Sequence, residues 1–256
     1  MRPLTKEAII LKSAADIEVM RRSCVIVAEV LRVLQENVRP GSTTMDLERI
    51  AEEEIKKRRA LPAFKGYRGY PFCLCTSLNS EVVHGMPSVR KVLKEGDIIS
   101  MDCGVFFEGF YGDSAVTVPV GNISNDAARL IDVTAASLEK AIEQAREGNR
   151  LFDISHAIQQ FVEAHGYSVV REFVGHGIGG ELHEPPQIPN FGPPGKGVRL
   201  KAGMVLAIEP MINMGAGSVK VLDDGWTAVT VDGKLSAHFE HTVAITPGGP
   251  YVLTRI

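Results

Sequence analysis

The feature that most restricts the fold of this chain is an internal duplication. When the sequence is shifted by 107 residues along itself, "LKEGDIISMD" at 93–102 aligns with "LKAGMVLAIE" at 200–209. Gly41 aligns with Gly148 at the same offset. Self-similarity at one offset indicates a structural unit that is used twice. We therefore expect a chain built from two related halves.

Each repeat carries one acid at the end of an apolar run and a second acid further on. In the first repeat these are Asp102 and Asp113, on either side of the turn residues Glu108-Gly109. In the second repeat they are Glu209 and Glu240, because "HFEHTVAI" around Glu240 resembles "YGDSAVTV" around Asp113. The offset is now 127 residues, so the second repeat has twenty extra residues between its acids (127 minus 107). Unpaired charges are costly in an apolar setting, so these carboxylates should have partners.

Hydrophobic periodicity assigns the same order of elements to both halves. Apolar residues at helical spacing predict helices at 14–37, 43–58, 126–146 and 151–165. Enrichment in Val, Ile, Phe and Thr predicts strands near 96–119 and 203–245. Each half thus runs helix, helix, strands, which predicts an α+β fold with an antiparallel sheet covered on one face by helices. We expect one catalytic domain over 1–256, with halves at about 12–120 and 121–250.

Turn chemistry predicts how the first pair of acids is arranged. If Glu108-Gly109 is the tip of a two-residue hairpin, Asp113 pairs with Gly104 across the ladder. Asp102 and Asp113 then lie on one face as diagonal neighbours. By the duplication, the acids of the second repeat should form an equivalent pair. Four converging carboxylates repel one another unless cations lie between them, and two divalent cations would neutralise the four charges.

Histidines supply candidate nitrogen ligands. His176 and His183 lie in a stretch rich in Gly and Pro, where loops often carry function. One imidazole with several carboxylates suits Mn, Fe, Co or Zn better than Mg or a structural zinc. His84, in "EVVHGMP", lies in an apolar context that taken alone favours a structural role. His238 would face the same side as Glu240, which favours a position supporting the ligands over a ligand role.

Composition excludes several classes of partner. The formal net charge of −3 gives no global reason to expect stable nucleic-acid binding or attachment to an anionic membrane. The basic runs at 56–59 and 90–91 are interpreted as solvated faces. No apolar stretch reaches the length of a membrane span, and the N-terminus lacks the apolar core of a signal peptide.

The four cysteines form no disulfide framework, which favours reduced thiols and a cytoplasmic location. We expect a monomer, because no amphipathic stretch is left over.

Five motifs carry a resemblance to a known family. They are "NSEVVHGMP", "MDCGVFFEGFYGDSAVT", "VGHGIGGELHEPPQIPNFG", "AIEPM" and "DGWTAVTVDGKLSAHFEHT". With these motifs the chain resembles the type I methionine aminopeptidases of bacterial form, from about residue 12 to 250. That family implies the pita-bread fold, in which two pseudo-symmetric halves share a curved, mostly antiparallel sheet. The absence of a zinc-binding extension before residue 12, and the 32 residues between His176 and Glu209, match the minimal form.

The resemblance also implies roles for individual residues. Two divalent ions (Co, Mn, Fe or Zn) would be held by a set of five ligands, with Asp113 and Glu240 bridging: Asp102, Asp113, His176, Glu209 and Glu240. Glu209 would also act as general base. His84 would hold the peptide near the scissile bond, and His183 would polarise its carbonyl.

A pocket for the methionine side chain is implied as well, formed by Phe64, Tyr67, Tyr70, Cys75, Leu182 and Trp226. The segment "FKGYRGYPFCLC" concentrates aromatic residues and thiols, which suit a thioether, although the same residues could simply pack the core. From the resemblance we would expect an aromatic residue in many relatives where this chain has Leu182. We expect this difference to reshape the pocket floor without affecting the chemistry.

The implied activity is metal-dependent hydrolysis of the first peptide bond, which removes the initiator methionine from nascent chains and peptides, with transient ribosome contact as a further expectation. One alternative is an X-Pro aminopeptidase or prolidase of the same fold, which usually carries an extra N-terminal domain and more histidines around the metals. Another is a catalytically inactive pita-bread protein that binds peptides or RNA. Proteins of that kind lose ligands, whereas all five are present here.

Overall fold

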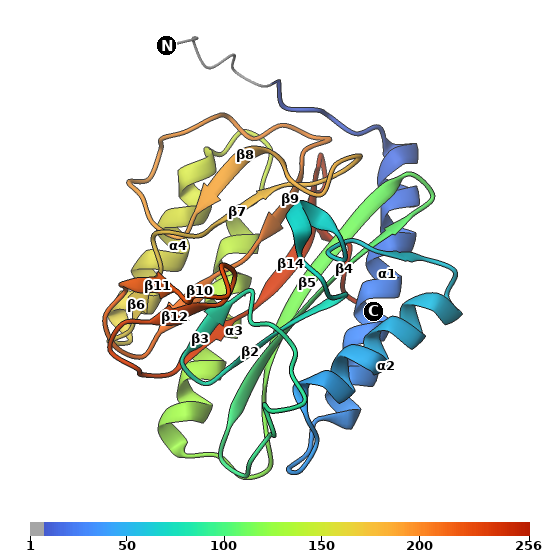
Figure 1. Ribbon diagram of the computed structural model, residues 1–256. Helices are drawn as coiled ribbons and strands as arrows, with labels where there is room; N and C mark the ends of the chain where they lie inside the picture. The colour runs from blue at the N-terminus through green and yellow to red at the C-terminus, as the bar shows by residue number, and fades with distance from the viewer. Residues whose placement is uncertain (1–7) are drawn as a thin grey trace, which may run out of the picture.

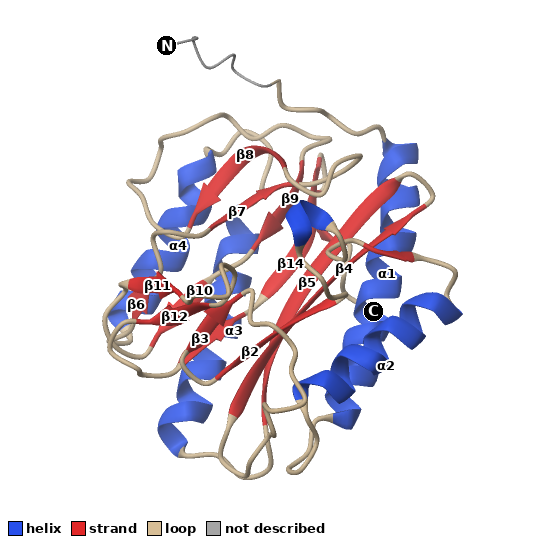
Figure 2. Ribbon diagram, viewed as in Figure 1, coloured by secondary structure: helices blue, strands red, loops and turns tan. Residues whose placement is uncertain are grey.

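Each half of the chain contributes two long helices to one face of a curved sheet. The computed structural model describes residues 8–256; residues 1–7, part of the N-terminal stretch in which the sequence predicts no signal peptide, lie outside the described residues. The helices are α1 (Ala14–Asn37), α2 (Thr44–Lys57), α3 (Asn125–Gln144) and α4 (Leu151–Ala164). Figures 1 and 2 show α1 and α2 together on one side, and α3 and α4 together on the other. The four predicted helices are confirmed to within two residues at each end.

The helix starts follow from local sequence chemistry. The side chain of Ser13 accepts a hydrogen bond from the backbone N–H of Asp16, whose carboxylate accepts from the N–H of Ser13 in return. Thr43 and Asp46 repeat this capping box at the start of α2. Such boxes satisfy N–H groups that have no partner inside the helix. Apolar residues at helical spacing then face the sheet and are buried.

The strands form one large sheet and two small ones. The large sheet has the order β1-β4-β5-β14-β9-β7-β8, with β2 paired to β4 and β15 paired to β14. Its strands are β1 (Leu61–Pro62), β2 (Leu74–Leu78), β4 (Ile98–Phe107), β5 (Phe110–Pro119), β7 (Val174–Gly177), β8 (Glu184–Pro189), β9 (Val205–Ile208), β14 (Glu240–Thr246) and β15 (Gly249–Val252). The small sheets are β13 (Ser236–His238), β10 (Met211–Asn213) and β6 (Ser168–Val169), and β11 (Val219–Val221), β12 (Ala228–Thr230) and β3 (Glu81–Val83).

The duplication is visible in the order of the central strands. The repeat offset matches β4 with β9, and the second block matches β5 with β14. In the sheet these strands run β4-β5-β14-β9, so equivalent strands lie symmetrically about the β5–β14 pairing. The outer strands continue the symmetry, because β2 pairs with β4 as β7 pairs with β9. This arrangement confirms the predicted α+β architecture with an antiparallel sheet.

The β4–β5 hairpin has the predicted register. Glu108 and Gly109 have φ values of 50° and 90°, as a two-residue hairpin turn of this kind requires. Gly104 pairs with Asp113, and Asp102 pairs with Ala115. Asp102 and Asp113 therefore project from the same face of the sheet.

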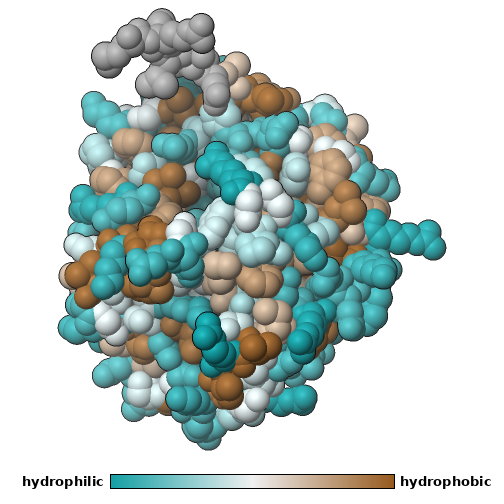
Figure 3. All heavy atoms as spheres, viewed as in Figure 1, coloured by the Kyte–Doolittle hydropathy of each residue, from teal (hydrophilic) through white to brown (hydrophobic). Residues whose placement is uncertain are grey.

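No helix within residues 8–256 is both long and apolar enough to cross a bilayer. Exposed apolar side chains do gather over β11 and β12, where Val221, Leu222 and Val231 are exposed (Figure 3). Elsewhere on this face, hydrophilic and hydrophobic side chains are interspersed.

Candidate functional site

Four strands of the large sheet bring the four predicted carboxylates together. Asp102 lies on β4, Asp113 on β5 and Glu240 at the start of β14, while Glu209 follows directly after β9. Because these strands are neighbours in the order β4-β5-β14-β9, their acids converge near the centre of the sheet. Asp102 and Glu209 lie on or directly after the outer two of these four strands and are 107 residues apart in the sequence. The symmetry of the sheet nevertheless places them around one site.

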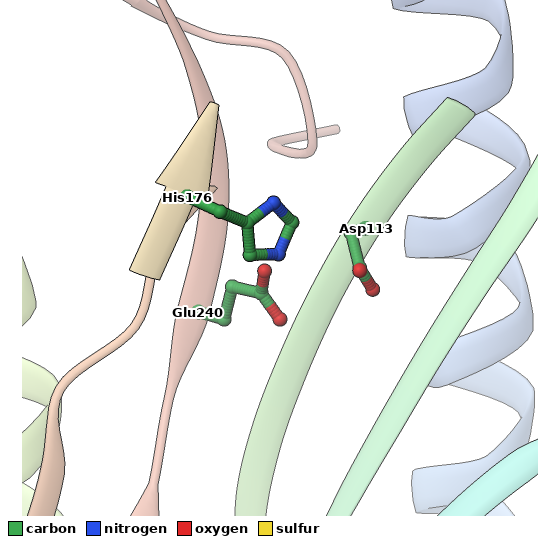
Figure 4. A group of neighbouring side chains, drawn as sticks. All are labelled: Asp113, His176 and Glu240. Atoms are coloured by element: carbon green, nitrogen blue, oxygen red, sulfur yellow. The ribbon is translucent and has the colours of Figure 1, made fainter. Parts of the chain in front are cut away.

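His176 reaches the same site from β7. Its Nε2 lies 3.6 Å from Oε1 of Glu209. Its possible ligand nitrogen and the oxygens of Asp113 and Glu240 all lie within 4.8 Å of one another. Figure 4 shows these three side chains pointing toward a shared space. The five predicted ligand residues are thus assembled from β4, β5, β7, β14 and the end of β9.

Burial makes this cluster of acids electrostatically unfavourable without a cation. Burial raises the pKa of Asp102 to about 7, and it raises the pKa of Glu209 to about 7. The pKa values of Asp113 and Glu240 are raised well above their usual range, first by burial and then by the neighbouring carboxylates. Ionisation of all four at neutral pH therefore requires a compensating positive charge.

The donor set fits divalent cations. Asp102 Oδ1, Asp113 Oδ1 and Glu240 Oε1 are buried and accept no hydrogen bond from the described residues. The Nδ1 of His176 lies 2.9 Å from the carbonyl oxygen of Gly177, which can only accept, so Nδ1 carries the hydrogen and Nε2 is free to act as a ligand. Several carboxylates with one imidazole suit Mn, Fe, Co or Zn.

A cavity of about 400 Å³ opens beside the acids. Tyr70 and Trp226 meet edge to face on its wall, with ring centroids 5.0 Å apart. Leu182, the residue at which many relatives were expected to have an aromatic, is buried at its edge. All six residues predicted for the methionine pocket line this cavity, together with both predicted histidines: Phe64, Tyr67, Tyr70, Cys75, Leu182, Trp226, His84 and His183.

Tyr67 contacts His183 as well as lining the pocket. Its hydroxyl lies 2.9 Å from His183 Nδ1, and the two rings stack with centroids 5.1 Å apart. Desolvation, followed by the charge of His176, lowers the pKa of His183 to about 3. The ring is therefore neutral at pH 7, with Nδ1 engaged by the phenol. Sequence reasoning had given Tyr67 only a place in the pocket wall.

His84, another residue of the cavity lining, is held in a strained conformation. Its φ of 59° lies in the left-handed region, which non-glycine residues rarely adopt and which is often found at functional sites. Its ring packs edge-on against Phe173 and Trp226. Burial lowers the pKa of His84 to about 4, so it is also neutral at pH 7.

His238 lies behind the carboxylates. It is buried, and its Nε2 is 3.6 Å from Oε2 of Glu209 without a hydrogen-bond partner among the described residues. Glu209 thus has an imidazole near each of its two oxygens, from His176 and His238. The sequence predicts for His238 a position that supports the ligands on the side of Glu240, and the structure places its ring beside Glu209.

Several cavity residues carried no signal in the sequence. Arg68 and Glu172 place opposite charges in the lining, and Val83, Phe173, Val174 and Gln187 complete it.

Glu184, directly after His183, forms a buried ion pair with Lys12. Neither partner could be identified beforehand, because a lysine near the N-terminus and an acid in a loop both have the pattern of exposed charges.

Comparisons with known proteins agree with this site. Residues 18–247 match the family model described as Metallopeptidase family M24. The methionine aminopeptidase of Clostridium perfringens (strain 13 / Type A) is 59% identical over 248 residues, which cover 97% of this chain and 99% of that protein. The crystal structure of methionine aminopeptidase from Thermotoga maritima superposes with a TM-score of 0.96 at 51% identity, covering 97% of this chain and 100% of that one.

A more distant structure shares the fold. The prolidase from Pyrococcus furiosus is 23% identical with a TM-score of 0.79, and the match covers 96% of this chain and 66% of that one. The predicted fold and the predicted family are both confirmed by these similarities. The chain belongs to metallopeptidase family M24 and, within that family, to the methionine aminopeptidases.

Proposed function

We propose that this protein removes the N-terminal methionine from nascent chains and short peptides by metal-dependent hydrolysis. The observation that supports this proposal best is the position of the cavity. Its walls of aromatic rings, Leu182 and the Cys75 thiol lie directly beside the cluster of acids. A flexible, polarizable thioether suits such walls. The first peptide bond of a bound substrate would then lie next to the acids.

The proposed ligands are Asp102, Asp113, His176, Glu209 and Glu240, and they would hold two divalent cations (Co, Mn, Fe or Zn). Asp113 and Glu240, the two most deeply buried acids of the cluster, would hold the cations together with the other three ligands. Bound cations of this type lower the pKa of water to near neutrality and polarise carbonyl groups.

The residues of the chain would move and hold protons around the scissile bond. Glu209, supported by two imidazoles, is proposed to accept the proton of the attacking water as general base. His183 is proposed to donate a hydrogen bond to the developing oxyanion from Nε2. The Tyr67 hydroxyl supports this role, because donation to Nδ1 leaves the ring hydrogen on Nε2. His84 is proposed to hold the amide side of the substrate.

The cellular setting proposed for this reaction is the cytoplasm, with the protein acting as a monomer and contacting the ribosome only transiently. Two of the four basic residues in the run at 56–59, at the end of α2, are engaged in ion pairs. Lys57 and Arg58 form ion pairs with Glu54, and Arg58 also pairs with Glu29. The net charge of −3 gives no global reason to expect stable nucleic-acid binding.

A coupled assay for free methionine from the peptide Met-Gly-Met-Met tests the proposal. Protein stripped with a chelator would be titrated with Mn, Fe, Co, Zn or Mg. Activity that is absent without metal and restored by one of these ions is the expected result. Cleavage of X-Pro peptides without release of methionine would favour the prolidase alternative. Metal binding with no cleavage of either substrate would favour an inactive binding protein.

A further inference from the structure

A buried ion pair joins the N-terminal segment to the loop that carries His183. Lys12 Nζ contacts a carboxylate oxygen of Glu184, and the two side chains are only 4% and 3% exposed. Buried charges require partners, so this contact strongly constrains both segments. The two residues are separated by 172 positions in the sequence. Neither residue lines the cavity, so any effect on the reaction has to pass through other residues.

The Glu184 carboxylate organises the loop around it. Its Oε1 accepts a hydrogen bond from the backbone N–H of Glu181, at 3.2 Å. The N–H of Gly179 donates to the carbonyl of Glu181, at 3.1 Å. His183 lies between these anchored positions, directly before Glu184. The position of the His183 backbone therefore depends on the carboxylate that Lys12 neutralises.

Gly179 provides the space for this ion pair. A Cβ at this position would lie 2.2 Å from Lys12 Cε and 2.6 Å from Glu184 Oε1, so only glycine fits without displacement. The carbonyl of Gly179 also accepts from the N–H of Tyr111, at 2.9 Å. Tyr111 precedes the proposed ligand Asp113 by two residues on β5. The loop is thus connected to one of the strands that carry the acids.

Lys12 makes a second connection, to the strand that leads to Glu209. Its backbone N–H donates to the carbonyl of Gly203 at 2.7 Å, and β9 begins two residues later. The Nζ also donates to the carbonyl of Ile10, at 3.3 Å, which folds the segment back on itself. One residue therefore holds both the His183 loop and the start of the strand that precedes the proposed base.

We propose that the Lys12–Glu184 pair is a positioning device that holds His183 in register with the carboxylate cluster. This role rests on the proposed function, in which His183 polarises the substrate carbonyl. Displacement of a catalytic group by about 1 Å can cost about a hundredfold in rate. Loss of the pair should therefore affect turnover more than substrate binding, because the pocket walls do not include either residue.

The test uses the full chain with Lys12→Met, Glu184→Gln and the double substitution. In all three, kcat for Met-Gly-Met-Met should fall by about tenfold to a hundredfold, with KM within about threefold of the parent. The double variant matters most, because it leaves no buried charge unpaired and so should fold even if Lys12→Met does not. Arg22→Met is the matched control, since Arg22 forms an exposed ion pair with Glu108 at the tip of the β4–β5 hairpin. It should match the parent.

Amide hydrogen exchange provides a readout that does not depend on activity. In the double variant, exchange should rise in segments 9–12 and 178–184 and stay unchanged in the core helices. A double variant with the kcat and the local exchange of the parent would overturn the proposal. Faster exchange throughout the chain would also overturn it, because the pair would then contribute only general stability. If the parent itself releases no methionine with any metal, the proposed function fails, while local exchange still tests whether the pair holds the loop.

Discussion

When divalent cations have been removed from this protein, its folded state should become more stable as the pH falls from about 8.5 to about 6.5. This trend follows from Asp102 and Glu209, whose pKa values burial raises to about 7 from 3.8 and 4.5. An acid with a raised pKa binds protons in the folded state at a pH where the unfolded chain binds none. The ionised cluster therefore destabilises the folded protein above pH 7, and protonation relieves this cost as the pH is lowered.

The magnitude follows from proton linkage. A carboxyl group with a folded pKa of about 7 and an unfolded pKa near 4 contributes about 1 kcal/mol between about pH 8.5 and 6.5. Asp102 and Glu209 together contribute about 1 to 2 kcal/mol, which corresponds to about 2 to 8 °C in melting temperature for a chain of this size. Asp113 and Glu240, whose pKa values are also raised, act in the same direction.

Histidines set the lower limit of this pH window. Burial lowers the pKa values of His84 and His241 to about 4. Below about pH 6.5 the unfolded chain binds protons at these histidines while the folded state does not. Stability is then lost as the pH falls toward 4, which opposes the effect of the acids. His183 and His238, whose pKa values are also lowered, act in the same way. Because unfolded imidazoles are already half-protonated at about pH 6.5, the histidines offset part of the effect of the acids there, and the acids act alone only above about pH 7.5.

Thermal melting of chelated protein across this window is the measurement. Asp102→Asn should show a smaller rise, because one of the buried charges is absent. With saturating Mn²⁺ the trend should reverse, since protons then compete with the cation for the same oxygens. Chelated protein that melts at the same or a lower temperature at pH 6.5 than at pH 8.5 would refute the reasoning. In that case, positive charges or hydrogen-bond donors of the chain itself would stabilise the four ionised carboxylates without a cation.

Three other substitutions separate the roles of individual residues. Glu209→Gln should lower kcat for Met-Gly-Met-Met by about a hundredfold or more while KM changes little; unchanged turnover would exclude Glu209 as the base. Tyr67→Phe keeps the ring beside His183 and removes only the hydroxyl, so kcat should fall by about tenfold in the same assay, and a parent value would exclude control of the tautomer. Glu48→Ala leaves two buried N–H groups at the start of β2 without their acceptor. It should lower the free energy of unfolding in urea by about 2 to 4 kcal/mol, whereas a change below about 0.5 kcal/mol would contradict this assignment.

The parts of the fold that local chemistry determines could be predicted from the sequence. The start of α1 is determined by the capping pair Ser13 and Asp16, and the register of the first hairpin by Glu108-Gly109. In both cases the deciding interaction lies within a few residues of the predicted feature. The meeting of the two halves could be predicted only through the duplication, because β5 and β14 are far apart in the chain.

Contacts between distant polar residues could not be predicted. Lys12 and Glu184 have the pattern of exposed charges, and only the folded chain shows that they are buried together. The contact between Tyr67 and His183 was missed for a related reason. An aromatic residue in an apolar segment is adequately explained by packing, so its hydroxyl gives no separate signal. The four acids were different, because each stands at or near an apolar run where a solvated charge is unexpected.

The two repeats differ at several positions, and these differences explain why the two halves of the site are not alike. β2 and β7 occupy equivalent positions, beside β4 and β9, but β7 carries His176 toward the acids whereas β2 carries Cys75 in the cavity wall. The twenty extra residues of the second repeat fall between Glu209 and Glu240. The segment between these two acids supplies Trp226 to the pocket and His238 to the carboxylate of Glu209. The repeated positions therefore provide the acids, and the positions that differ between the repeats provide the pocket and the imidazoles.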